Sequence, residues 1–146
     1  MAKRAQAEDD LRKLSVEMRY LEQTAETLQQ RISMVNAALT DLTYANMTLD
    51  GIEQESENAE MLVPIGGSSY VKVKLADKDK IIVGMGSGVS IEKTLPEAKA
   101  TLKERLDELE KTMTAAQQQF AQVAERINAG RARLETLLSS VREGKQ

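Results

Sequence analysis

The chain has 146 residues, a formal net charge of −3, 29% charged and 41% apolar residues, but only 3% aromatic residues. So few aromatic side chains favour an extended architecture over a large globular core. The small net charge argues against nucleic acid or a membrane surface as partners. No apolar run is as long as a membrane-spanning helix, which needs about 18 residues. Without Cys there are no disulfides. The first residues lack the apolar core of a signal peptide, so a cytoplasmic protein is expected.

An apolar stripe with heptad spacing runs through the first third of the chain. Its positions alternate by three and four residues and are Leu11, Leu14, Met18, Leu21, Ala25, Leu28, Ile32, Val35, Leu39, Leu42, Asn46 and Leu49. A stripe that repeats every 3.5 residues stays on one face only when helices supercoil around each other, so this segment needs a helical partner. Asn46, the one polar position, either fixes the register of the pair or is solvated near the helix end.

A second stripe of the same length occupies the last third. Its positions are Leu102, Leu106, Leu109, Met113, Ala116, Phe120, Val123, Ile127, Gly130, Leu134, Leu137 and Val141. Thr94 and Glu97 have the spacing of a capping box and mark the start of the helix, with Pro96 tolerated in the first turn. Gly130 predicts a hole against the opposite helix and a local weak point. Two helices of about 45 to 55 residues each most simply pair as an antiparallel hairpin.

Between the stripes the pattern changes to that of β-strands. Four strands are expected at residues 61–65, 70–75, 80–85 and 89–93, forming two successive hairpins. In the second strand Val71 and Val73 share one face, and in the fourth Val89 and Ile91 alternate with polar residues. Since the helices use their apolar stripes on each other, this sheet has no partner layer in its own chain and is expected to bury its face against other subunits.

Several patterns resemble catalytic or ligand sites, and each has a simpler explanation. The run Gly84–Gly88 lies between strands and lacks the Lys-Ser/Thr of a phosphate-binding loop, so a hairpin turn explains it better. Ser90 and Lys93 have the spacing of an acyl-enzyme motif, but on a strand they face opposite sides. The chain has no His. A cluster of acidic residues where the first helix ends is either a solvated collar or a weak cation site: Glu53, Glu55, Glu57 and Glu60. No enzyme activity, metal or cofactor is expected.

The middle segment carries a more specific pattern. It reads LVPIGG at residues 62–67, IVGMGSGV at 82–89 and EKTL at 92–95. This Gly-punctuated double hairpin between two equal heptad helices resembles the α-class subunit of the prefoldin family, whose β-class subunits have one hairpin only. The resemblance covers the whole chain. It divides the chain into a coiled-coil helix at 1–58, a double hairpin at 59–93 and a second helix at 94–146, within one structural domain.

The resemblance implies an assembly and a function. The fold class is α+β, mainly α: a long antiparallel two-helix coiled coil joined by two β-hairpins that form an oligomeric β-barrel. Two α-type chains, this one and a second copy, would join four β-type prefoldin subunits in a hetero-hexamer. Such a chaperone holds unfolded or nascent polypeptides at its coiled-coil tips without ATP and delivers them to a group II chaperonin. A different class, a passive coiled-coil scaffold or spacer oligomerised through its β segment, predicts no affinity for unfolded chains.

Two sets of residues receive roles from this resemblance. The barrel would be built from the apolar strand residues Val63, Ile65, Tyr70, Val71, Val73, Ile81, Ile82, Val83, Val89 and Ile91. The client-binding tips would contain Leu11, Leu14 and Met18 facing Leu134, Leu137, Leu138 and Val141. Turns at helix ends open at little free-energy cost, which would expose these side chains. Most of them are also ordinary coiled-coil core, and this alternative stays open.

Overall fold

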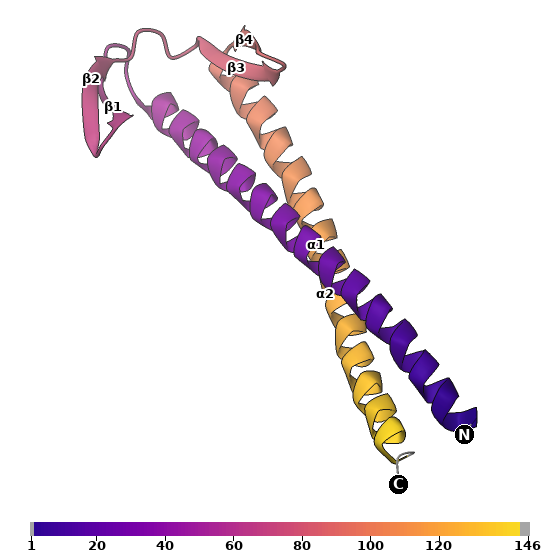
Figure 1. The fold of residues 1–146 in the computed structure, drawn as a ribbon. Coiled ribbons are helices and arrows are strands. Elements are labelled where there is room, and N and C mark those ends of the chain that lie inside the picture. The colour runs from indigo at the N-terminus through magenta and orange to yellow at the C-terminus, as the bar shows by residue number, and fades with distance from the viewer. Residues whose placement is uncertain (1, 144–146) are drawn as a thin grey trace. The chain divides into compact units, whose positions relative to one another are not determined.

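The computed structural model describes residues 2–143. Two long helices, α1 (Ala2–Gln54) and α2 (Leu95–Glu143), flank four short strands, β1 (Glu60–Gly66), β2 (Ser69–Lys74), β3 (Ile81–Gly86) and β4 (Val89–Lys93) (Figure 1). This order confirms the predicted α+β class with two long helices and two small hairpins. Among residues 2–143, no helix combines the length and the apolarity needed to cross a bilayer.

The chain divides into two compact units. The terminal unit combines the described parts of residues 1–36 and 111–146, and the hairpin unit comprises residues 37–110. The division of the sequence into 1–58, 59–93 and 94–146 stays a prediction.

The terminal unit is an antiparallel pair of helical segments from α1 and α2. Their described ends lie at the same end of the unit (Figure 1). Met18, Leu21, Met113 and Ala116 are buried between the segments, and the other predicted seam residues of this unit are half-buried. The heptad prediction is therefore confirmed here, because the positions that it placed in the seam are the ones removed from solvent.

The hole predicted at Gly130 is partly filled by a side chain of the opposite helix. A Cβ atom built on Gly130 would overlap Sδ of Met18 and lie 3.4 Å and 3.6 Å from the Cε and Cγ atoms of the same side chain. Met18 therefore occupies the space that the missing side chain leaves. An unbranched, flexible Met side chain is well suited to fill such an irregular gap.

The hairpin unit has a small core of its own. Leu49, Val83, Leu95 and Ala98 are buried together, and Ile52, Ile81 and Leu102 pack against them. The second hairpin thus lies on the end of α1 and the start of α2. The expectation that the strands find no partner layer in their own chain is wrong for this hairpin, because Leu95 and Ala98 extend the apolar surface of α2 beyond the predicted seam.

The four strands form two separate two-stranded sheets, β1 with β2 and β3 with β4, rather than one four-stranded sheet. The hairpins repeat each other: Val63 pairs with Val71, and twenty positions later Val83 pairs with Ile91. Each turns through a two-residue loop with both φ angles positive, +58° and +59° at Gly67 and Ser68 in the first. Such loops match the twist of the paired strands, which explains the Gly and Ser residues at the turns.

The start of α2 has the predicted capping box. The Thr94 amide donates to Oε2 of Glu97 at 3.4 Å, and the Glu97 amide donates to Oγ1 of Thr94 at 3.3 Å. These two bonds satisfy amides that have no partner within the helix. The capping box therefore fixes where α2 begins, directly after β4.

Candidate functional site

The hairpins expose an unusual amount of apolar surface. Seven of the ten side chains assigned to a barrel are exposed in the chain: Val63, Ile65, Tyr70, Val71, Ile82, Val89 and Ile91. Val73 and Ile81 are half-buried. Leu62, which is 61% exposed, and Met85 are further exposed apolar residues of the hairpins and were not predicted. Clustered exposed apolar side chains of this kind mark interaction surfaces.

Val83 does not belong to that exposed surface. It is only 4% exposed and packs in the core of the hairpin unit, so its assignment to contacts with other subunits is wrong. Its counterpart in the first hairpin, Val63, is 41% exposed. On this face of the first hairpin lie Met61, Val63, Val71 and Val73, since paired residues and those two positions apart share a face. The two hairpins pair their residues in the same way, but helices cover this face of the second hairpin and leave that of the first hairpin open.

The strand edges are open as well. In a two-stranded sheet every strand has one unpaired edge with free N–H and C=O groups, and an isolated two-stranded hairpin is only marginally stable in water. The first hairpin continues for one further pair of bonds, from the Asn58 amide to the Leu75 carbonyl at 2.8 Å and from the Leu75 amide to the Ala59 carbonyl at 3.0 Å. Its outer edges remain available for pairing with another chain.

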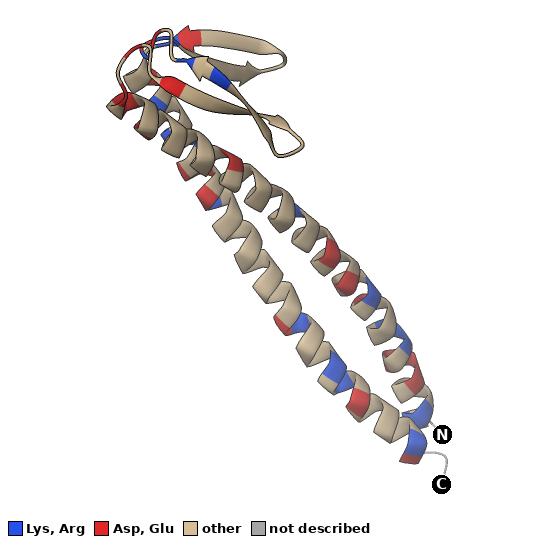
Figure 2. Ribbon diagram, turned by 90° about the vertical axis from the view of Figure 1, so that its left-hand side faces the viewer, with Lys and Arg blue, Asp and Glu red and all other residues tan. Residues whose placement is uncertain are grey.

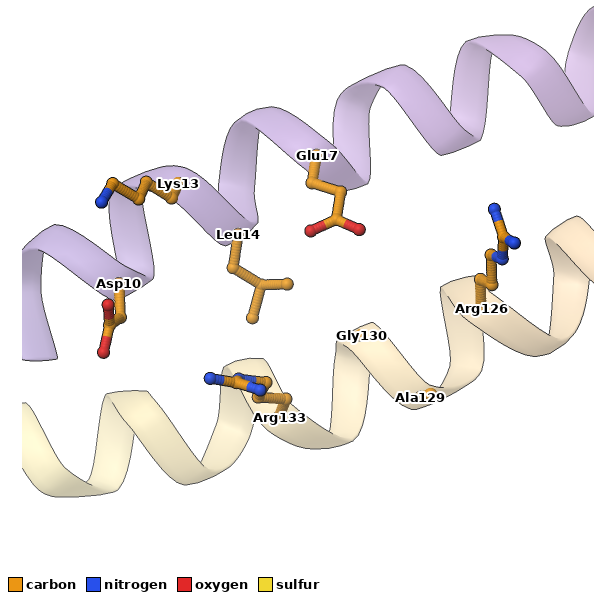
Figure 3. Close-up of a pocket in the computed structure, with 8 residues that line it drawn as sticks. All are labelled: Asp10, Lys13, Leu14, Glu17, Arg126, Ala129, Gly130 and Arg133. Atoms are coloured by element: carbon orange, nitrogen blue, oxygen red, sulfur yellow. The ribbon is translucent and has the colours of Figure 1, made fainter.

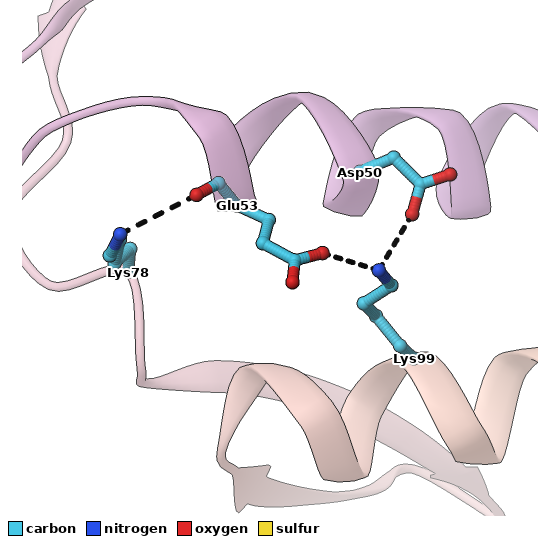
Figure 4. A network of polar contacts seen from close by, with 4 residues as sticks. All are labelled: Asp50, Glu53, Lys78 and Lys99. Atoms are coloured by element: carbon cyan, nitrogen blue, oxygen red, sulfur yellow. Dashed lines mark hydrogen bonds and ion pairs between the residues drawn. The ribbon is translucent and has the colours of Figure 1, made fainter.

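A polar network ties together the helix ends of the hairpin unit (Figure 4). Nζ of Lys99 on α2 lies 2.9 Å from Oδ1 of Asp50 and also contacts the Glu53 carboxylate on α1. These contacts, with Glu53 first and Asp50 second, raise the pKa of Lys99 above its ordinary value. Nζ of Lys78, between the hairpins, donates to the Glu53 and Glu55 carbonyl oxygens at 3.5 Å and 3.4 Å.

This network explains part of the acidic cluster at the end of α1. The last turn of α1 contains no basic residue, and Lys78 supplies positive charge to the carbonyls there from outside the helix. Within residues 2–143, no group of three or more His, Asp or Glu residues is placed to hold a metal ion. Within the cluster, the Glu53 carboxylate thus holds Lys99, whereas Lys78 is held by backbone carbonyl groups.

The residues assigned to client binding lie in the terminal unit, where they differ in exposure. The seam residues Leu11, Leu14, Leu134, Leu137 and Val141 are half-buried, and Leu138, beside the seam, is exposed. Met18 is only 7% exposed and covers Gly130, so it offers no free surface for a client. Its assignment to the client-binding set is corrected on this ground.

An opening of about 540 Å³ lies beside Leu14 in the terminal unit. Figure 3 shows Leu14 of α1 directed toward α2, where Ala129 and Gly130 present almost no side chain. Asp10, Lys13 and Glu17 of α1 and Arg126 and Arg133 of α2 form its charged rim. The seam is thus incompletely filled around an apolar side chain, and an apolar group from another molecule has room to contact Leu14.

The glycine-rich run between β3 and β4 is a turn, as the sequence predicts. Gly86, Ser87 and Gly88 have φ angles of +97°, +53° and +77° and connect two antiparallel strands. A phosphate-binding loop leads instead into a helix N-terminus. The positive φ angles account for the glycines without a ligand.

Comparison with known proteins decides among the families that share long coiled coils. A family model described as prefoldin subunit matches residues 21–140. This chain belongs to the prefoldin family. The prefoldin alpha subunit of Methanococcoides burtonii is 35% identical over 83% of this chain and 88% of its own length. That of Pyrococcus horikoshii is 34% identical over 84% of each chain.

Solved prefoldin structures have the same fold. A filamentous PFD of Methanocaldococcus jannaschii, solved by cryo-EM, is 24% identical with a TM-score of 0.66, covering 79% of this chain and 95% of that one. The prefoldin beta subunit of Thermococcus strain KS-1 is 19% identical with a TM-score of 0.59, covering 87% and 90%. The α-class assignment is confirmed by the alpha-subunit relatives, and the chain is a chaperone subunit of a family that assists group II chaperonins.

Proposed function

We propose that this chain is the α-type subunit of a hetero-hexamer with a second copy of itself and four β-type prefoldin subunits. The complex holds unfolded or nascent polypeptides in its terminal units without ATP, in the cytoplasm, and passes them to a group II chaperonin. Neither nucleotide turnover nor another enzyme activity takes part.

The observation that carries the assembly is the unequal burial of the two equivalent hairpins. Val83 is covered by helices of its own chain, whereas Val63, at the same place in the first hairpin, is open. Exposed apolar residues and free edges make the first hairpin complementary to a strand and an apolar face of another subunit. Joining several such hairpins would complete the proposed barrel through Val63, Ile65, Val71 and their neighbours.

Client binding is supported by the unfilled seam of the terminal unit. A holdase needs apolar surface that is available without collapsing on itself. The half-buried residues Leu11, Leu14 and Leu137, the exposed Leu138 and the opening beside Leu14 provide this near the described helix ends. Helix ends open at low free-energy cost, so a client could reach these residues without unfolding the hairpin unit.

The proposal is tested with a complex in which Leu11, Leu14, Leu137 and Leu138 are all replaced by Ser. Client affinity is expected to fall by about tenfold or more, since apolar surface that contacts the client is removed. Binding of a fluorescent, chemically denatured protein measures this, with helix content and assembled size checked first. Leu→Met replacements at the same four positions are the matched control and should retain binding.

Unchanged binding by the Ser variant would mean that the client site lies elsewhere. Because three of the four residues lie in the seam, the single exposed substitution Leu138→Ser serves as a second variant that leaves the helix pair intact. If the correctly assembled wild-type complex has no affinity for unfolded chains at all, the passive scaffold becomes the better account.

A further inference from the structure

The outer face of α1 in the terminal unit carries a stripe that the helix pair does not use. It consists of Val16, Tyr20, Gln23, Thr27, Gln30 and Met34, here called the outer stripe. Each of these follows a seam residue by two positions, which places it about 200° around the helix from the seam. Val16, Tyr20 and Met34 are 63%, 68% and 74% exposed.

From Val16 to Met34 the outer stripe is free of charge within a charged segment, and the position before it in the same series is Lys13. Glu17, Arg19, Glu22, Glu26 and Arg31 lie in the same stretch of α1, yet all of them fall off the stripe. Figure 2 shows how densely charged residues follow one another near the N-terminal end of this helix. A solvent-facing helix surface is normally the most charged one, so an uncharged face that carries Val, Tyr and Met is unusual.

The corresponding face of α2 in the same unit provides an internal comparison. Its positions two beyond the seam are Ala115, Gln118, Gln122, Glu125, Ala129, Ala132, Thr136 and Ser139, with Lys111 and Glu143 at the ends. No large apolar side chain occurs among them. The outer stripe is therefore a property of α1 alone and does not follow from the coiled-coil repeat.

The composition of the stripe indicates what it contacts. Of the predicted seam residues of α1, only Asn46 is polar, whereas half of the outer stripe is Gln or Thr. That is too polar for a permanent seam with another helix. Gln, Thr and Tyr side chains can form hydrogen bonds with unpaired backbone groups of another chain. Met and Tyr side chains can pack against varied apolar side chains. Because the stripe has no charge, it repels neither acidic nor basic segments.

We infer that the outer stripe is an accessory binding track for extended segments of an unfolded client polypeptide. The inference rests on the proposed function and extends it from the end of the seam onto the outside of α1. From Val16 to Met34 the track is about 27 Å long, enough for about eight residues of extended chain. A shallow hollow of about 310 Å³ beside Tyr20, Gln23 and Thr27 offers a place for one apolar side chain.

Site-specific crosslinking tests the inference directly, because the chain contains no Cys. Single variants Tyr20→Cys and Met34→Cys are labelled with a photoreactive benzophenone, assembled with the β-type subunit and irradiated with a denatured test protein. Leu138→Cys, in the proposed client site, is the positive control. Gln118→Cys and Gln122→Cys, exposed on the outer face of α2, are the matched controls.

Crosslinks to the client from Tyr20 and Met34 at the level of Leu138, and well above those from Gln118 and Gln122, are the expected result. Crosslinks from Leu138 alone would overturn the accessory track and leave the proposed function standing. No crosslink from any position would overturn both. Crosslinks from Tyr20 to another subunit in the absence of client would make the stripe a subunit contact and overturn the inference.

Introducing charge on the surface gives an independent measurement. The pair Tyr20→Glu and Met34→Glu should weaken client binding by about tenfold, as the loss of two anchoring contacts does, while Gln118→Glu and Gln122→Glu should leave it unchanged. All four positions are exposed, so helix content and assembly should be retained. If both pairs of Glu variants weakened client binding equally, the loss would be a nonspecific effect of added charge, and the inference would be overturned.

Discussion

At the scale of single residues, Gly130 and Met18 show how a weak seam position is repaired. Spacing alone placed Gly130 in the seam and Met18 in the opposite one, and both positions are confirmed. Heptad spacing could not show that the Met18 side chain bends into the place of the absent Gly130 side chain. The spacing gives neither side-chain rotamers nor the relative shift of the two helices along their axes. The two residues form one packing unit, which makes their effects on stability interdependent.

This interdependence is tested by a double-mutant cycle on the free energy of unfolding. Gly130→Ala gains about 1 kcal/mol of helix propensity but overpacks Met18 at a cost of about 1–3 kcal/mol, so a small net loss is expected. Met18→Ala alone leaves a cavity and should cost about 2–3 kcal/mol. In the double variant the methyl group introduced by Gly130→Ala has room, and the combined loss should be smaller than the sum by about 1 kcal/mol.

Urea unfolding of the assembled complex, followed by circular dichroism at the helical signal, measures the cycle. The pair Ala115→Gly and Gln122→Ala, at exposed positions of α2 in the same unit, controls for propensity effects. Additive losses in the Met18 and Gly130 cycle would show that the two side-chain positions do not compete for the same space.

At the scale of elements, the sequence predicts the helices better than it predicts which residues pack against the strands. The two long helices and the Thr94–Glu97 cap follow from local spacing, and local spacing is what the sequence displays directly. The burial of Val83 does not follow from it. The predicted seam of α2 begins at Leu102, which leaves Leu95 and Ala98 without a role, and these two residues join Leu49 of α1 in the core around Val83.

The repeat of the hairpins makes a sharp comparison possible at this scale. Val63→Asp and Val83→Asp introduce the same charge at equivalent places. The Val83 variant should unfold the hairpin unit, because an unpaired carboxylate in its core costs several kcal/mol. The Val63 variant should keep its fold and fail to assemble, since Val63 is covered only by another subunit in this account.

Amide hydrogen exchange of α2 near Ala98 reports on the fold, and light scattering after size exclusion reports on assembly with the β-type subunit. Val63→Thr, which keeps the β-branched shape without a charge, is the conservative control and should still assemble. Normal assembly of the Val63→Asp variant would show that the open face of the first hairpin is not the subunit interface.

At the scale of the whole molecule, the chain is a prefoldin subunit, and the proposed function divides the work of a chaperone between its two units. The hairpin unit offers open strand edges and apolar side chains for assembly, and the terminal unit offers an incompletely filled seam for clients. The proposed division needs no nucleotide, because it relies on apolar contacts that the chain offers at rest. The family is evident from the sequence, whereas the exposure of Val16, Tyr20 and Met34 on the outer stripe of α1 is known only from the structure.

The most direct test of this account is the aggregation of a chemically denatured protein diluted into the assembled complex of this chain and its β-type subunit, without ATP. Light scattering follows aggregation, with buffer and an inert two-helix coiled coil as controls. The account predicts suppression at a near-stoichiometric amount of complex. Aggregation that proceeds as in buffer, from a mixture verified to be assembled, would contradict it.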